Sequence, residues 1–267
     1  MFGGGSMLLK GKTAIVYGGS GAVGGAVAKA YAREGAKVVL AARGRDGLER
    51  VAEEIRAAGG QAEVGLVDAT DPAAVAAHLA EAVARTGPIQ VMFNAVSWDD
   101  TQGEPLTVMP FERMLAPITT GMTSWFHTGT AMARHMGEHG GGVIVGITAN
   151  VARVTAGNVG GFGIACAAVE NFLRQLAIEE GPKGVRVCWV RSPGSPDAPG
   201  VREMWQLSAD ELGLSFEDLH RDYARNVPLR RVTGLAQVAD AAVLLSSDLA
   251  AGMTATFANA TGGALID

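Results

Sequence analysis

The chain has 267 residues, with 27 acidic and 22 basic side chains and a formal net charge of −5 at pH 7. This acidic balance excludes a general nucleic-acid binder, because such proteins neutralise phosphates with an excess of Lys and Arg. No apolar run approaches the length of about 18 residues that a membrane-spanning helix requires. We therefore expect neither nucleic acid nor membrane as a partner.

Residues 1–8 are rich in glycine, and we expect them to form a flexible extension before a single domain over 9–267. Two cysteines, Cys166 and Cys188, are too few for a disulfide framework, which favours the reducing cytoplasm. The five histidines have no metal-ligand spacing with cysteine or acidic residues, so we predict no metal site.

Strand and helix patterns alternate along the chain. Short apolar, β-branched runs predict strands over 12–17, 36–41, 62–67, 89–94, 143–148, 185–191 and 254–258. Helical patterns occupy 21–34, 46–58, 72–85, 111–136, 163–180, 201–225 and 235–246, and Pro117 must kink or cut the fourth of these. Repeated strand–helix units with short connections predict an α/β fold, a Rossmann-type doubly wound parallel sheet.

A glycine-rich turn joins the first strand to the first helix. Glycine permits a tight turn and lets the backbone approach a pyrophosphate at the helix N-terminus. The turn therefore predicts a dinucleotide site that includes Gly18, Ser20, Gly21, Ala22, Val23 and Gly24.

The ends of the second and third strands indicate which dinucleotide would bind. Arg43 follows the second strand where NAD sites usually carry a carboxylate, and its guanidinium suits the 2′-phosphate of NADP. The alternative is that Arg43 is exposed to solvent and that the site binds NAD. After the third strand, Asp68 and Ala69 would lie at the adenine, although Asp68 could instead cap its own turn.

These motifs resemble those of the short-chain dehydrogenase/reductase family over about residues 9–267. Gly18 and Gly24 match the family's glycine motif, whereas Tyr17 replaces its Thr and Ala22 its middle glycine. The resemblance also places the cofactor beside Asp68, beside the loop Asn94, Ala95 and Val96, and beside the turn Pro193 and Gly194. Ala198 takes the place of the Thr that steadies the nicotinamide carboxamide in the family.

The same resemblance implies that the catalytic tetrad Asn, Ser, Tyr and Lys has been replaced. Phe162 lies thirteen residues after Ala149, and Cys166 lies four residues further, which is the family's spacing of Ser, Tyr and Lys. Ile118 falls at the position of the Asn. We therefore expect a mechanism without the usual Tyr acid. Cys166 could be a nucleophile or a small buried side chain.

Four polar residues are candidates for replacement chemistry. Asp99 and Asp100 follow the fourth strand, where one carboxyl could donate a proton or both could form a solvated turn. Thr148 and Asn150 flank Ala149 and could bind a substrate oxygen, or satisfy backbone groups at the end of the strand.

Residues 195–232 occupy the position of the family's substrate lid, and their apolar side chains predict a medium-sized, partly apolar small-molecule substrate. The family resemblance also implies a homodimer or homotetramer.

Three functions are compatible with these observations. The first is an NADP-binding oxidoreductase acting on an acceptor that needs no Tyr acid, such as a conjugated alkene, an iminium or a self-protonating substrate. The second is a non-redox lyase, cyclase or isomerase on the same scaffold. The third is a non-catalytic nucleotide-binding subunit.

Overall fold

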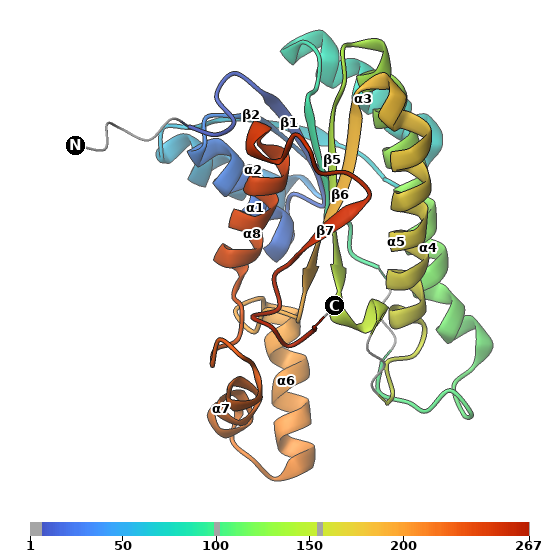
Figure 1. The fold of residues 1–267 in the computed structure, drawn as a ribbon, viewed down its shortest axis with the longest axis vertical. Helices are drawn as coiled ribbons and strands as arrows, with labels where there is room; N and C mark the ends of the chain where they lie inside the picture. The colour runs from blue at the N-terminus through green and yellow to red at the C-terminus, as the bar shows by residue number, and fades with distance from the viewer. Residues whose placement is uncertain (1–6, 99–101, 154–156, 267) are drawn as a thin grey trace.

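Seven parallel strands form one sheet in the order β3-β2-β1-β4-β5-β6-β7, with helices on both faces (Figure 1). The computed structural model describes residues 7–98, 102–153 and 157–266. The strands are β1 (Thr13–Tyr17), β2 (Lys37–Ala42), β3 (Gln61–Leu66), β4 (Val91–Asn94), β5 (Gly142–Ala149), β6 (Val185–Ser192) and β7 (Thr256–Asn259). This single α/β domain confirms the predicted doubly wound fold.

The helices connect these strands and continue beyond them. They are α1 (Ala22–Arg33), α2 (Arg45–Ala57), α3 (Pro72–Thr86), α4 (Phe111–Glu138), α5 (Gly161–Glu180), α6 (Pro199–Leu212), α7 (Phe216–Asn226) and α8 (Leu235–Ser246). Short 3-10 turns are η1 (Asn150–Ala152), η2 (Gly181–Lys183) and η3 (Asp248–Ala250). The predicted bounds differ from these by one to two residues at most ends, as helix fraying and strand ends allow.

The sheet separates two apolar layers. Successive residues of a strand face opposite sides, and accordingly Val16 packs with α1, α2 and α8, while Ile15 packs with α3, α4 and α5. Both strand residues are fully buried. Burial on both faces explains why the central strands have continuous apolar sequences.

One helical prediction needs correction, and one of the two effects predicted for Pro117, a kink or a cut, is excluded. The segment predicted as one helix over 201–225 forms α6 and α7, because Gly213 adopts the left-handed conformation (φ +67°) and Ser215 begins a new helix by accepting the Asp218 N–H at 3.1 Å. Conversely, Pro117 does not cut the long helix, and α4 continues through it over 28 residues.

The α6–α7 segment projects beyond the carboxyl ends of the strands (Figure 1). Its first end is fixed by Asp197, whose carboxylate accepts the N–H of Leu235 at the start of α8 at 2.9 Å. Its second end is fixed by Leu229, whose N–H donates to the carbonyl of Gly262 at 3.1 Å. The segment predicted as a substrate lid is thus attached at two points, to the start of α8 and to the turn after β7.

Candidate active site

The loops singled out in the sequence converge at the carboxyl edge of the sheet. The parallel topology brings the ends of β1, β4, β5 and β6 together there, and the order reverses between β1 and β4. Open α/β sheets bind ligands in the crevice at such a reversal point. The candidate site therefore lies at this edge of the sheet.

The glycine-rich turn has almost no room for side chains. Gly18 has φ +75°, and a Cβ there would lie 2.2 Å from the carbonyl oxygen of Ala95. A Cβ on Gly24 would lie 2.2 Å from the oxygen of Gly18. These approaches hold the turn against the loop after β4, so glycine is required at both positions for packing alone.

The start of α1 faces outward with free backbone donors. Gly21 caps the helix without a side-chain hydrogen bond, and the Gly25 N–H makes the first return bond, to the Gly21 carbonyl, at 2.8 Å. The N–H groups of Ala22, Val23 and Gly24 consequently have no acceptor within the helix. Such a terminus attracts anions, phosphate among them.

Arg43 and Asp68 lie on the neighbouring loops and are both exposed. Hydrogen bonds from the side chain and backbone of Thr70 lower the pKa of Asp68, and the charge of Arg43 lowers it further. Asp68 therefore caps its own turn, as one of the two interpretations proposed, while remaining accessible. Ala69 beside it is buried.

Asn94 stabilises its loop from within. The side chain is 1% exposed, donates to Thr128 Oγ1 at 3.0 Å and accepts the Val96 N–H at 2.9 Å. The Ala95 N–H donates to the carbonyl of Tyr17 at 2.9 Å. In this arrangement Asn94 shapes the loop, and the backbone of Ala95 and Val96 is the part that adjoins the glycine turn.

The turn after β6 contains a residue that the sequence did not indicate. Gly194 has φ +84°, and its N–H donates to Ser192 Oγ at 3.3 Å. Ser195 follows; it is 4% exposed, and its Oγ has no hydrogen-bond partner. A buried hydroxyl without a partner is costly, and a bound polar group would relieve this cost.

The four positions that the sequence resemblance aligns with the tetrad come from three elements at the same edge. Ala149 is the last residue of β5, Phe162 and Cys166 lie one turn apart on α5, and Ile118 lies on α4. A Cβ on Gly161 would lie 1.8 Å from the Met114 carbonyl oxygen. The start of α5 is thus pressed onto α4 next to Ile118 and Phe162. Cys166 is fully buried, which argues against its use as an exposed nucleophile.

The chain has three tyrosines, and each packs in a different part of the fold. Tyr17 is buried beneath α3, with its ring 5.9 Å from that of His78. Tyr31 Oη and Ser246 Oγ are 2.6 Å apart. Tyr223 packs on Trp205, with ring centroids 5.1 Å apart, in the α6–α7 segment.

The candidate replacements fare differently. Asp99 and Asp100 lie outside the described residues. Thr148 is 4% exposed, and its hydroxyl donates to Glu170 Oε1 at 2.9 Å, so this hydroxyl is engaged within the fold. Asn150 begins η1 and is half-buried.

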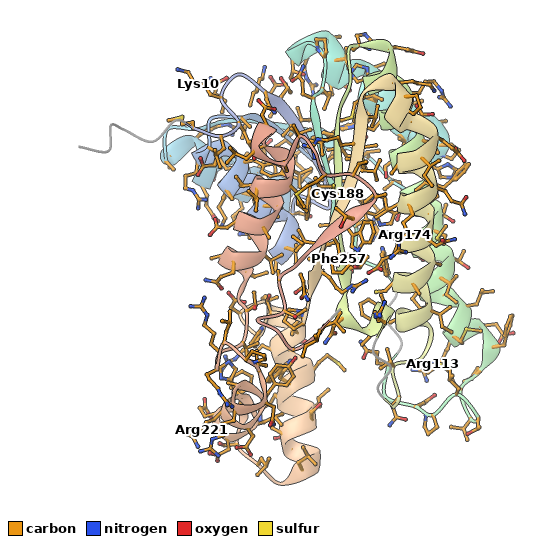
Figure 2. All side chains as sticks on the ribbon, in the orientation of Figure 1. Lys10, Arg113, Arg174, Cys188, Arg221 and Phe257 are labelled. Carbon is orange, nitrogen blue, oxygen red and sulfur yellow. The ribbon has the colours of Figure 1, made fainter. Side chains whose placement is uncertain are left out.

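Glu170 belongs to an ionic cluster that the sequence did not reveal. Its carboxylate accepts from Arg191 and, at 3.3 Å, from Arg174. Arg174 lies over the Trp189 ring and Arg191 over the Phe257 ring; Arg174 and Phe257 are labelled in Figure 2. The cluster ties α5 to β6 and β7 directly beneath the site.

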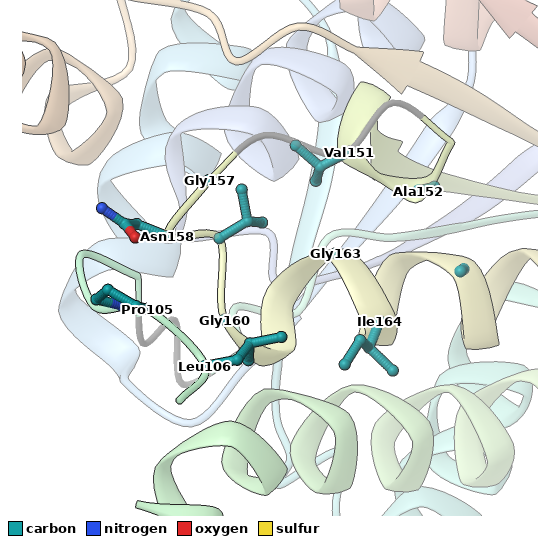
Figure 3. Close-up of a pocket in the computed structure, with 11 residues that line it drawn as sticks. Pro105, Leu106, Val151, Ala152, Gly157, Asn158, Gly160, Gly163 and Ile164 are labelled. Carbon is teal, nitrogen blue, oxygen red and sulfur yellow. The ribbon is translucent and has the colours of Figure 1, made fainter. Parts of the chain in front are cut away.

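An apolar cavity of about 510 Å³ opens beside the start of α5 (Figure 3). Leu106, Val151 and Ile164 line it, and among its described lining residues only Asn158 has a polar side chain. Gly163, Ile164 and Ala167 line the cavity from one face of α5, whereas Phe162 and Cys166 lie on another face of the same helix and are not among its lining residues.

Within ranges 7–98, 102–153 and 157–266, His, Cys, Asp and Glu side chains form no group of three suited to a metal ion. Every helix of the described chain is too short or too polar to cross a lipid bilayer.

Comparison with known proteins agrees with the architecture. The family model described as "Enoyl-(Acyl carrier protein) reductase" matches residues 19–264. The 7alpha-hydroxysteroid dehydrogenase of Escherichia coli (strain K12) is 26% identical over 98% of each chain. An uncharacterised oxidoreductase of Mycobacterium tuberculosis is 30% identical, over 94% of this chain and 91% of its own.

Among solved structures, the F189W actinorhodin polyketide ketoreductase with NADPH superposes with a TM-score of 0.85 at 25% identity, covering 95% of this chain and 97% of its own. The family match extends over nearly the whole chain, and the superposition shows the same overall fold. The protein belongs to the short-chain dehydrogenase/reductase family.

Proposed function

We propose that the protein is a nicotinamide-dependent oxidoreductase that prefers NADPH and reduces a medium-sized apolar small molecule without a Tyr acid. The observation that carries this proposal is the outward-facing start of α1, held by the close approach of Gly18 to Ala95. That geometry supports a pyrophosphate at Gly21, Ala22, Val23 and Gly24.

The surrounding residues fit the rest of a dinucleotide. Ser20 and Arg43 would hold the 2′-phosphate, and Asp68 with Ala69 would adjoin the adenine. Ala95, Val96, Pro193 and Gly194 would line the nicotinamide half. The unpartnered hydroxyl of Ser195 supports the same placement, because the nicotinamide carboxamide could satisfy it.

When bound, the dihydronicotinamide supplies a hydride, that is, one hydrogen with two electrons. A ketone that accepts a hydride becomes an alkoxide, which requires a proton donor in place. Phe162 and Ala149 have no acidic proton, and Thr148 Oγ1 is committed to Glu170. The residues therefore favour an acceptor that needs no protein acid, such as a conjugated alkene, an iminium or a self-protonating substrate.

The apolar cavity supports the predicted substrate class. Its aliphatic lining and the α6–α7 segment beyond the strand ends would exclude water from a bound apolar group. The lid role of residues 195–232 is part of this proposal.

Calorimetric titration with NADPH and NADH tests the cofactor binding on which the proposal depends. We expect NADPH to bind more tightly than NADH, and protein that binds neither would refute the oxidoreductase function. A panel of ketones, enones and iminium ions should then reveal turnover by NADPH absorbance.

The absence of proton donors at Ala149 and Phe162 also favours a second candidate, a nucleotide-binding subunit without turnover. Tight NADPH binding with no turnover across the panel would support this second candidate over the first.

We also propose that the protein is a homo-oligomer located in the cytoplasm. Phe126 is 53% exposed on α4, and its ring lies 6.2 Å from that of Phe172 on α5, which supports a homodimer or homotetramer through these helices. Cys166 and Cys188 are buried and form no disulfide with each other, which is compatible with the cytoplasm. Sedimentation analysis would test the oligomeric state.

A further inference from the structure

Two aromatic rings meet beside the proposed reaction site. Trp98 lies four residues beyond the end of β4, and Phe162 is the second residue of α5. Their ring centroids are 5.7 Å apart, and the ring planes are inclined by 53°. Both side chains are only half-buried, so part of their ring surface remains accessible to a ligand.

Trp98 is held in place by its neighbours. A Cβ on Gly121 of α4 would lie 3.1 Å from the indole, so the ring rests directly on the helix backbone. Its Nε1–H is buried and has no hydrogen-bond partner. Packing between α4 and α5 therefore holds the indole in place, without polar contacts.

The inclined rings form a corner with a definite electrostatic character. The face of an aromatic ring carries negative charge density and attracts cations within about 6 Å of its centroid. Two inclined rings at this separation allow one positive group to contact both. The formal net charge of −5 also favours the approach of a cation over that of an anion.

We propose that Trp98 and Phe162 form the binding corner for a cationic iminium substrate. This inference rests on the proposed function and selects one acceptor class from it. A neutral ketone would become an alkoxide beside two rings that cannot protonate it. An iminium already carries its positive charge and is neutralised by the reaction.

The electron balance of the step requires no protein acid. The iminium carbon accepts the hydride and its two electrons, which form a new C–H bond. The π pair of the C=N bond moves to nitrogen as a lone pair. The cofactor is oxidised from NADPH to NADP⁺, and no proton is consumed.

The test compares two ligands of similar two-ring skeleton. N-methyl-3,4-dihydroisoquinolinium is a permanent cation because its nitrogen carries no proton, and 1-tetralone is a neutral ketone. Titration of protein loaded with the tetrahydronicotinamide analogue of NADPH measures binding alone, because its uncharged ring transfers no hydride and does not repel a cation as NADP⁺ would. We expect the cation to bind at least about tenfold more tightly than the ketone.

Substitutions of the two aromatic residues test whether their rings cause the preference for the cation. Trp98→Leu and Phe162→Leu should each weaken cation binding about five- to tenfold, while ketone binding changes less than about twofold. Trp98→Phe keeps an aromatic face and should retain most of the preference. Phe111→Leu, at the exposed start of α4, is the matched control and should alter neither ligand.

The outcomes are separable. Equal or tighter binding of 1-tetralone would overturn the inference and indicate a carbonyl held by the Trp98 N–H. Retention of the cation preference in folded Trp98→Leu or Phe162→Leu protein would also overturn it, and either variant suffices if the other does not fold. Failure to bind the NADPH analogue would refute the proposed function as well.

Discussion

Glu170 and Arg191 form a buried two-point ion pair between α5 and β6. Glu170 Oε1 accepts from Arg191 Nε at 2.9 Å and Oε2 from Nη2 at 2.6 Å. Their side chains are only 4% and 2% exposed. The Arg191 guanidinium also lies 3.8 Å from the centroid of the Phe257 ring. Both charges are thereby satisfied without water, and α5 is fixed against the strands that end at Ala149 and Ser192.

Removing one member of this pair should strongly destabilise the protein. Arg191→Met leaves the Glu170 carboxylate buried with weaker partners, and Glu170→Gln leaves a buried guanidinium. Each should lower the free energy of unfolding by about 3–5 kcal/mol, measured by urea denaturation. The double variant Glu170→Met with Arg191→Met should lose less than either single change, because no buried charge is left unpaired; Arg174, which also pairs with Glu170, is 43% exposed.

An exposed pair provides the control. Arg33 Nη2 lies 2.8 Å from Asp240 Oδ1, and both side chains are more than half exposed. Arg33→Ala should cost no more than about 1 kcal/mol. A loss of similar size at Arg191 would contradict the structural role assigned to the buried pair.

Two histidines should make stability fall in mildly acidic solution. Burial lowers the pKa of His78 and of His135, and the charge of His139 lowers the latter further. His135 Nε2 also accepts the Ile89 N–H at 3.0 Å, which requires an unprotonated nitrogen. The unfolded chain therefore takes up protons below its ordinary histidine pKa of about 6.5, while the folded chain resists them.

Stability should accordingly be complete above about pH 6.5 and decrease as the pH falls toward 5. The slope can reach about 1.4 kcal/mol per pH unit for each histidine. Denaturation at pH 7.5 and 5.5 would measure the decrease, and His78→Phe should flatten it. The carboxylates with lowered pKa, such as Asp248, act only below about pH 4, outside this window. A decrease unchanged in the variant would exclude His78 as its source.

Cofactor preference should depend on Arg43. Its guanidinium can make charge-assisted hydrogen bonds with a 2′-phosphate that NADH lacks. Arg43→Ala should weaken NADPH binding about 10- to 100-fold and leave NADH binding unchanged, as measured by calorimetry. Arg45→Ala is the matched control, because Arg45 pairs with Glu49 on α2. Equal losses for both cofactors would contradict 2′-phosphate recognition.

Ser195 should contribute to binding of the nicotinamide half of the dinucleotide and not to binding of the adenosine half. Its buried hydroxyl lacks a partner in the fold, and one hydrogen bond to the carboxamide is worth about 0.5–1.5 kcal/mol. Ser195→Ala should weaken NADP⁺ binding about three- to tenfold and leave binding of adenosine 2′,5′-bisphosphate unchanged. Ser208→Ala, exposed on α6, should affect neither ligand. Equal weakening of both ligands would indicate a general effect on the fold.

The success and failure of sequence reasoning have a common physical origin. Local patterns suffice for the strands and for glycines such as Gly18, because periodicity and backbone conformation are encoded nearby. They could not reveal the pairing of Glu170 with Arg191, which are 21 residues apart on different elements. Likewise, the unpartnered state of the Ser195 hydroxyl depends on what surrounds it in space. Arg191 itself ends the predicted strand over 185–191, and only the fold shows which residue it pairs with.

The most direct prediction concerns the missing acid. If Ala149, Phe162 and Cys166 stand where Ser, Tyr and Lys serve in the family, restoring all three should create ketone reduction. In the triple variant Ala149→Ser, Phe162→Tyr and Cys166→Lys, the phenol can protonate the alkoxide and the ammonium can lower its pKa. We expect NADPH-dependent reduction of 1-tetralone at least about 100-fold faster than in the unmodified protein, at the lower end of what general acid catalysis supplies.

The positions of the three residues make this test specific. Phe162 and Cys166 share one face of α5 because they are one helical turn apart, and Ala149 ends the strand that α5 packs against. A control variant that carries the Tyr one residue further along α5, as Gly163→Tyr with Phe162 retained, should show no increase in the rate of ketone reduction. Its ring would no longer lie on the face shared by Phe162 and Cys166. Lack of a gain in triple variant protein that folds and binds NADPH would show that the alignment of these positions with the tetrad is incorrect.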